Sequence, residues 1–270
     1  MIHIATVHWL TDRWVDVQLR YLQRHVAGAY RTYAFLNGPD VERHADRFDV
    51  VETKGGSAQH PVKLNRLAQR VLEHAGDDDL LVFLDGDAFP VVALEPALRE
   101  LLDRAPLVAI RRDENGDLYP HPSFCATTAG FWRRLGGDWR RGKPWTLPDG
   151  GYVHSEVGAR LLRQLHEGNY EWTPLLRTNA RNLHPLLFGL YGDLVYHHGA
   201  GYRYPLTRAD MEWVKSVRAE GDLARAREAA RGWRIARNME LDRRVYREIQ
   251  RDDEFWRKLF ATDGGPPSAG

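Results

Sequence analysis

A short apolar run that ends in two carboxylates constrains this chain more than any other feature. Residues 80–84, Leu-Leu-Val-Phe-Leu, are followed at once by Asp85-Gly86-Asp87, and Pro90 ends the run. A continuous apolar run of this length is typical of a strand buried on both faces of a parallel sheet. Ligands of open α/β sheets collect at the carboxyl ends of such strands, so we expect Asp85 and Asp87 at a ligand site.

The spacing of the two aspartates requires a turn. On a regular strand, Asp85 and Asp87 would point to opposite faces of the sheet. Gly86 permits the backbone to turn, so both carboxylates can reach one hard cation. An acidic turn after a strand has the same local sequence, and these three residues alone do not separate it from a metal site.

The residues before this run predict alternating strands and helices. The expected strands are residues 2–8, 30–36, 48–52 and 80–84, and the expected helices are residues 12–28 and 61–74. The order β-α-β-β-α-β predicts an α/β fold with a Rossmann-like, mixed but mostly parallel central sheet flanked by helices, the first strand being central. No Gly-x-Gly-x-x-Gly follows the first strand and no Walker loop is present. The sequence therefore argues against a standard dinucleotide or P-loop site.

The second half of the chain is less regular. Expected elements are a helix over residues 94–102, strands over residues 107–110, 123–129, 170–176 and 194–196, and a long loop up to Gly151. Ser155 is the expected cap of a helix that begins at Ser155-Glu156. Residues 207–260 form a charged helical pattern, which Gly232 is expected to divide.

Composition excludes several classes of protein. Of the 270 residues, 43% are hydrophobic and 11% aromatic, which is ample for a core. Lys and Arg number 38 against 37 Asp and Glu, so no net field favours nucleic acid or a membrane surface. The single cysteine, Cys125, excludes an internal disulfide and a cysteine cluster. No secretory signal and no run of about 18 apolar residues is present, so we expect a cytoplasmic protein without a transmembrane segment.

A second polar cluster follows a later apolar stretch. It contains His197, His198, Gly199, Gly201 and Arg203. Adjacent histidines at a strand end point apart, so at most one of them meets a given ion. A turn with one core histidine and one solvent histidine fits the same residues.

Taken together, these motifs resemble the GT-A superfamily of nucleotide-sugar glycosyltransferases over roughly residues 1–205. The shared points are Asp85-Gly86-Asp87, the helix with Lys63 before it, and a late His198-x-x-Gly201 like that of glycogenin-like members. Tyr204-Pro205 stands where those members have Lys-Pro, so the pyrophosphate contact is expected from Arg203. The resemblance implies a GT-A catalytic domain of residues 1–205. The charged helical pattern predicts a C-terminal extension of residues 206–262, and the Gly, Pro and Ser content predicts a disordered tail of residues 263–270.

The resemblance also implies a metal site. Asp85, Asp87 and a late histidine would hold Mn²⁺ or Mg²⁺ on the pyrophosphate of a UDP-, GDP- or dTDP-linked sugar. The position of the histidine relative to Gly201 in the His-x-x-Gly motif favours His198 over His197 as the ligand. The chemistry agrees, because a cation neutralises the charge that develops on a departing diphosphate. Carboxylates suit Mg²⁺ or Mn²⁺, and a nitrogen ligand favours Mn²⁺.

The remaining donor contacts are positional expectations. The nucleoside is expected over the carboxyl end of the first strand and the edge beside it, with the diphosphate against the turn. The expected donor-binding residues are Thr6, Val7, His8, Asn37, Lys63, Asp85, Gly86 and Arg203. Core packing or a surface role explains Thr6, Val7, His8, Asn37 and Lys63 equally well.

The acceptor side has fewer signals. Inverting GT-A enzymes place an acidic base at a helix start in the second half, which matches Glu156, with Asp149 as the second candidate. A carboxylate at a helix amino end is also favoured by the helix dipole alone. A retaining enzyme needs neither acid as a base, so the stereochemistry stays open and the acceptor unknown. Trp132, Trp139 and Trp145 suit either sugar stacking or core anchoring.

Two other functions fit part of the pattern. Haloacid-dehalogenase-type phosphatases carry Asp-x-Asp after an apolar strand, with the first Asp, here Asp85, as nucleophile. Phe89 stands where that motif has Thr or Val, and the motif normally lies on the first strand of the chain. A non-catalytic, carbohydrate-binding GT-A-like domain is the other alternative. Turnover of labelled nucleotide sugars with Mn²⁺ distinguishes these functions.

Overall fold

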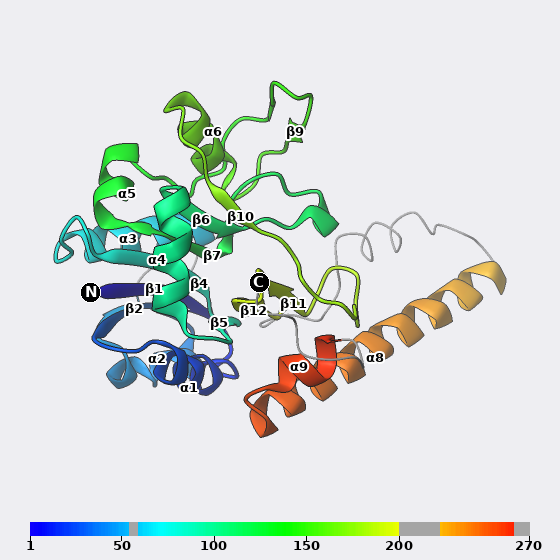
Figure 1. Ribbon diagram of the computed structural model, residues 1–270. Coiled ribbons are helices and arrows are strands. Elements are labelled where there is room, and N and C mark those ends of the chain that lie inside the picture. The colour runs from blue at the N-terminus through cyan, green and yellow to red at the C-terminus, as the bar shows by residue number, and fades with distance from the viewer. Residues whose placement is uncertain (54–58, 200–221, 262–270) are drawn as a thin grey trace.

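The computed structural model describes residues 1–53, 59–199 and 222–261, with the backbone alone for residues 222–231. Figure 1 shows helices packed on both faces of a twisted sheet. The strands are β1 (Ile2–Trp9), β2 (Tyr30–Asn37), β3 (Val50–Glu52), β4 (Leu80–Asp85), β5 (Ala88–Pro90), β6 (Leu107–Ile110), β7 (His121–Thr128), β8 (Trp145–Thr146), β9 (Tyr152–Val153), β10 (Thr173–Leu175), β11 (Gly189–Tyr191) and β12 (Val195–His197). The helices are α1 (Val15–His25), α2 (Pro39–Glu42), α3 (His60–Leu72), α4 (Leu94–Arg104), α5 (Ala129–Leu135), α6 (Ala159–Glu167), α8 (Asp222–Arg251) and α9 (Phe255–Phe260), with 3-10 turns at Ala45–Arg47 and Asp113–Asn115.

Within the described residues, the main sheet has seven strands in the order β10-β6-β7-β4-β1-β2-β3. Only β7 runs antiparallel to its neighbours in this described sheet. The predicted mixed, mostly parallel α/β sheet is therefore confirmed. The expectation that the first strand is central is wrong by one position, because β4 holds the middle and β1 lies next to it. Strands β6, β7 and β10 extend the sheet on the side of β4 opposite β1, so the middle position of the sheet falls on β4.

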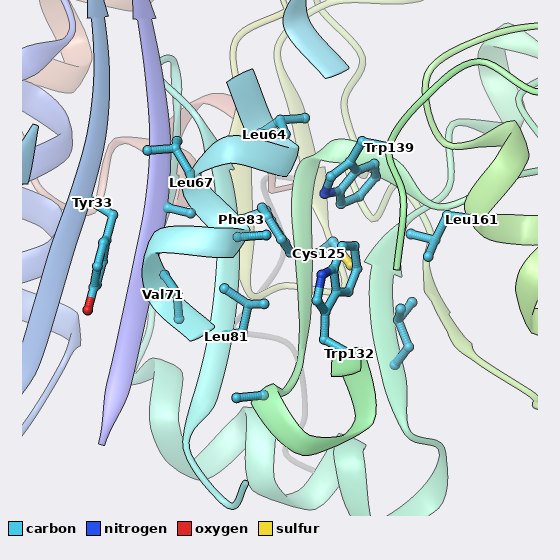
Figure 2. Close-up of a cluster of buried hydrophobic side chains, with 14 of the residues drawn as sticks. Tyr33, Leu64, Leu67, Val71, Leu81, Phe83, Cys125, Trp132, Trp139 and Leu161 are labelled. Atoms are coloured by element: carbon cyan, nitrogen blue, oxygen red, sulfur yellow. The ribbon is translucent and has the colours of Figure 1, made fainter. Parts of the chain in front are cut away.

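The inner strands β1 and β4 are buried on both faces, as the apolar run in β4 predicts. Alternate residues of β4 contribute to opposite cores: Leu81 and Phe83 pack with α3, α5 and α6, and Leu80 and Val82 pack with α1 and α4. Figure 2 shows the first core, where Phe83 lies beside the indoles of Trp132 and Trp139. These two tryptophans are 2% and 0% exposed. Both are core anchors, so the sugar-stacking role considered for them is wrong.

A second, three-stranded sheet has the order β11-β12-β5 and is antiparallel. Its strand β5 begins directly after the Asp85-Gly86-Asp87 turn and ends at Pro90. The pairing places Ala88 opposite His197 and Pro90 opposite Val195. The aspartate turn therefore joins the main sheet to the small one, and β12 brings His197 to the turn.

The helices α8 and α9 pack against α1 and the small sheet. Val245, Ile249 and Phe255 enter an aromatic core with Tyr21 and Tyr196. Gly232 lies inside α8, so the predicted division of the helical pattern at this glycine is wrong. Among the described helices, none combines the length and the apolar composition that crossing a membrane would require.

Candidate functional site

A cleft of about 1530 Å³ opens at the carboxyl ends of β1 and β4. Its floor includes His8 and Asp85, and its sides come from α3, from the segment after β6, from β12 and from α8. This is the edge of an α/β sheet at which ligands bind.

Asp85, Asp87 and His197 come together on the floor of this cleft. Each offers one ligand atom, and these atoms all lie within 4.8 Å of one another. The Nε2 atom of His197 is 3.9 Å from Oδ2 of Asp85 and 3.7 Å from Oδ1 of Asp87. Two carboxylates and one imidazole are a donor set that a divalent cation such as Mn²⁺ or Mg²⁺ accepts. This group could hold such an ion.

The turn requires glycine at its centre. A Cβ atom at Gly86 would lie 2.8 Å from Nδ1 of His8 and 2.8 Å from the carbonyl oxygen of Val7. The amide of Gly86 donates to that same oxygen at 3.1 Å, which ties the turn to β1. The amide of Gly199 donates to Oδ2 of Asp87 at 3.0 Å, which ties the turn to the end of β12.

His198 points away from the two aspartates. Its Nε2 lies 2.6 Å from Oδ1 of Asp242 on α8, and its Nδ1 lies 2.9 Å from the hydroxyl of Tyr196. The ring is fully buried and packs 4.5 Å from the ring of Trp14. The structure thus places His197, and not the expected His198, with the aspartates. Neighbouring residues of a strand face opposite ways, and the pairing of β12 with β5 turns His197 toward the cleft.

The other elements of the late motif, Gly201, Arg203 and Tyr204-Pro205, lie outside the described residues.

His60, which the sequence analysis missed, contacts Asp85 of the metal group, the name used here for Asp85, Asp87 and His197. It is the first residue of α3, and its Nε2 lies 3.1 Å from Oδ1 of Asp85. Burial alone would raise the pKa of Asp85, but the contact with His60 and the nearby His197 hold this pKa below its ordinary value. The carboxylate is therefore ionised at neutral pH. The sequence marks His60 only as a histidine at the start of the helix that precedes the strand of Asp85.

Gln18 is a second residue that the sequence analysis missed. It is fully buried on α1, and its side-chain amide donates to the carbonyl oxygens of Asp85 and Ala88 at 2.8 and 2.7 Å. No local motif marks this residue, because it lies among the apolar positions of an ordinary helix.

The expected donor-binding residues divide into two groups. Those that line the cleft are Val7, His8, Lys63, Asp85 and Gly86. Thr6 and Asn37 are buried and do not belong to the cleft lining among the described residues. The hydroxyl of Thr6 donates to Oε1 of Gln18 at 2.9 Å, and the carbonyl of Asn37 accepts from Leu10 at 2.9 Å.

Lys63 is 2% exposed and lies against an aromatic face. Its ammonium is 3.2 Å from the centroid of the Trp9 ring. Burial lowers the pKa of Lys63 to about 8, so most of its population is protonated at neutral pH. A buried cation with an aromatic neighbour is well suited to receive an anion from the cleft.

Glu156 lines the cleft but does not begin a helix. The helix α6 starts at Ala159, after Gly158 with φ of 103°, so the predicted start at Ser155-Glu156 is wrong. A Cβ atom at Gly158 would lie 2.1 Å from the carbonyl oxygen of Pro120, which explains why this left-handed residue is glycine and why the helix begins late. The Glu156 side chain is 40% exposed and lies 3.9 Å from Arg141.

Asp149 lies in the turn between β8 and β9. Its Oδ1 accepts from the amide of Gly151 at 2.9 Å. In the part of the chain that the structure describes, Asp149 does not line the cleft. Of the two acids expected on the acceptor side, the structure brings only Glu156 to the cleft.

No protein-family model matches this chain, and no curated protein matches it. Among the solved structures that are similar to it are the following two. One is residues 1–349 of TarS from S. aureus, with 10% identity and a TM-score of 0.37 over 51% of this chain and 50% of that chain. The other is the mannosyltransferase PcManGT from Pyrobaculum calidifontis in complex with GDP-Man and Mn²⁺, with 12% identity and a TM-score of 0.40 over 67% of this chain and 58% of that chain.

The matched part of this chain spans between half and three fifths of those two chains. Both TM-scores lie below 0.5, and the function proposed below therefore rests on the arrangement of the site's own residues.

Proposed function

We propose that this protein is a metal-dependent glycosyltransferase that moves a hexosyl group from a nucleoside-diphosphate sugar to an acceptor. One observation carries the proposal: Asp85, Asp87 and His197 present ligand atoms within 4.8 Å of one another on the floor of a large cleft. The cleft opens where ligands of α/β sheets bind, and its volume of about 1530 Å³ leaves room for a nucleotide sugar and an acceptor.

The residues present fit a divalent cation. Asp85, Asp87 and His197 would hold it, and His60 would fix the second oxygen of Asp85. When bound, Mn²⁺ or Mg²⁺ neutralises the negative charge of the nucleoside diphosphate as the glycosidic bond breaks. His197 as a nitrogen ligand favours Mn²⁺.

The donor is placed by the cleft residues on its β1 and α3 side. Val7 and His8 would lie against the nucleoside, and the ammonium of Lys63 would face a phosphate. No ion pair in the described part of the chain involves Lys63, whose ammonium lies over the aromatic faces of Trp9 at 3.2 Å and Phe35 at 5.3 Å. A donor that carries two phosphates supplies the missing counter-charge.

Glu156 is the proposed general base for an inverting reaction. It lines the cleft, its side chain is partly exposed, and Arg141 is its nearest cation at 3.9 Å. Glu114 also lines the cleft, but its Oε1 is occupied by a 2.6 Å hydrogen bond that it accepts from the hydroxyl of Tyr191. Glu156→Gln should abolish transfer and leave donor binding unchanged; normal turnover by this variant would remove Glu156 from the mechanism.

The experiment that tests the function uses labelled UDP-, GDP- and dTDP-sugars with Mn²⁺. We expect hydrolysis or transfer of at least one donor, and loss of this activity with a chelator or in the Asp85→Asn/Asp87→Asn double variant. Asp113→Asn is the matched control, since Asp113 is an acid that pairs with Arg111 at 2.6 Å outside the cleft lining of the described residues. Turnover that survives both the chelator and the double variant would overturn the proposal.

A further inference from the structure

The side chain of Gln18 fills all four of its hydrogen-bonding positions at the base of the aspartate turn. Its Nε2 donates to the carbonyl oxygens of Asp85 and Ala88, one on each side of the turn. Its Oε1 accepts from the hydroxyl of Thr6 at 2.9 Å and lies 3.1 Å from Nε2 of His8. An amide offers two donors and two acceptor positions, so none is left over.

These contacts fix the orientation of the amide. Backbone carbonyls only accept hydrogen bonds, so the nitrogen of Gln18 must face Asp85 and Ala88. The oxygen must then face His8, and an oxygen only accepts. The Nε2 atom of His8 therefore carries the hydrogen.

The second nitrogen of His8 is an acceptor as a consequence. Burial lowers the pKa of His8 to about 4, so the ring is neutral at pH 7 and has one N–H. With that hydrogen on Nε2, the lone pair lies on Nδ1, the atom next to Gly86. His8 lines the cleft, and no described residue hydrogen-bonds to its Nδ1.

We infer that Gln18 is a positioning residue with two effects. It holds the backbone on both sides of the Asp85-Gly86-Asp87 turn, and it fixes His8 in the tautomer whose Nδ1 accepts a hydrogen bond from a ligand in the cleft. The ligand group must be an N–H or O–H donor. If the ligand is the nucleoside of the proposed sugar donor, which rests on the proposed function, a base N–H or a ribose hydroxyl fills this role.

The tautomer is tested directly on the wild-type protein. Nitrogen-15 chemical shifts of the His8 ring at pH 7 should show a protonated Nε2 and a bare Nδ1. In Gln18→Met, which removes every hydrogen bond of the amide, this single tautomer should give way to a mixture. A wild-type ring protonated on Nδ1 would overturn the inference, and this measurement needs neither a substrate nor a metal.

The effect on the turn is tested with Mn²⁺ alone. Gln18→Met and Gln18→Glu should weaken Mn²⁺ binding by about 10- to 100-fold, the loss typical of residues that orient metal ligands. Gln18→Glu keeps the size of the side chain but sets a carboxylate against two carbonyl oxygens. Unchanged Mn²⁺ affinity in both variants would contradict the positioning role.

Asn65→Leu is the matched control for a merely structural effect. The Asn65 amide also bridges two parts of the fold, with contacts of 2.8 Å to Asp138 and 2.9 Å to the amide of Trp139. This variant should lose stability and keep both the His8 tautomer and the Mn²⁺ affinity. A wild-type protein that binds no Mn²⁺ would contradict the proposed function, whereas the His8 shifts would still decide the inference about Gln18.

Discussion

The adjacent histidines at the end of β12, His197 and His198, have different surroundings, and their substitution should have different effects. His197→Ala removes a nitrogen that lies within 4 Å of both aspartates, so Mn²⁺ affinity should fall by more than about 10-fold with little change in stability. His198→Ala empties a fully buried position beside Asp242 and should lower the free energy of unfolding by about 3 kcal/mol. Isothermal titration with Mn²⁺ and urea unfolding measure the two quantities.

The reverse order of effects, with Mn²⁺ binding lost in His198→Ala and kept in His197→Ala, would contradict this assignment of the two side chains. His154→Ala is a suitable control, because His154 lines the same cleft and is not part of the metal group.

Gly86 is a second position at which one added methyl group should change stability and metal binding. In Gly86→Ala the new methyl group would meet Nδ1 of His8 and the Val7 carbonyl at 2.8 Å, so the turn must shift. Overpacking of this kind costs about 1–3 kcal/mol, and the shift should also weaken Mn²⁺ binding. Urea unfolding and Mn²⁺ titration check both effects. A Gly86→Ala protein with wild-type stability and metal affinity would show that the turn accommodates a methyl group without a steric clash, and would contradict the prediction.

The sequence predicts the aspartates but not their partners. Asp85 and Asp87 follow their strand directly, so local pattern is enough to place them at the edge of the sheet. His197 and His198 are neighbours with the same side chain, and only the pairing of β12 with β5 decides which one faces the cleft. Gln18 acquires its role from a contact with residues nearly seventy positions away, which no local pattern records.

Helix α8 continues through Gly232, a residue of low helix propensity. At Gly232 a Cβ atom would meet nothing within 4 Å, and the backbone is helical. Gly232→Ala should therefore stabilise the helix by about 1 kcal/mol, because alanine has the higher helix propensity. Amide hydrogen exchange in the helix should slow by up to about five-fold, the factor that this energy implies. Faster exchange would indicate that the helix needs flexibility at this residue.

Element boundaries depend on contacts that the sequence does not show. The helical pattern around Ser155 predicts the helix correctly in kind, yet the structure delays its start to Ala159 because Gly158 must pass close to Pro120. In the same way, Pro90 reads as the end of a strand, whereas residues Ala88–Pro90 form a strand of a different sheet.

At the scale of the whole molecule, the protein should lose stability as the pH falls from 7 to 5. Burial holds the pKa of His3, His8 and His121 below the ordinary value of 6.5. The unfolded chain therefore binds protons first as the pH drops through 6.5, and stability falls. For His8, with a pKa of about 4, the loss at pH 5 is about 2 kcal/mol.

Urea unfolding at pH 7 and pH 5 measures this loss, and His8→Gln is the control variant, which should lose less. The carboxylates with lowered pKa values, such as Asp79 at about 2, remain ionised throughout this range and contribute only at lower pH. Equal stability at the two pH values would contradict the prediction.

The fold class follows from the order of apolar runs, since each run is long enough to be assigned alone. The position of β1 in the sheet does not, because it depends on how many strands add beyond β4. The small sheet was predicted only in part: the strand expected at residues 194–196 corresponds to β12, but its pairing with the three-residue strand β5 spans a long stretch of chain that no local pattern records.

The antiparallel pairing of β5 with β12 has a consequence for the order in which the chain matures. Asp87 and His197 are 110 positions apart, so during synthesis the aspartate turn exists long before its histidine emerges. Closing so long a loop is slow compared with local folding. An ion that needs both segments therefore cannot assist the early steps, and metal should lengthen the lifetime of the finished protein by slowing its unfolding.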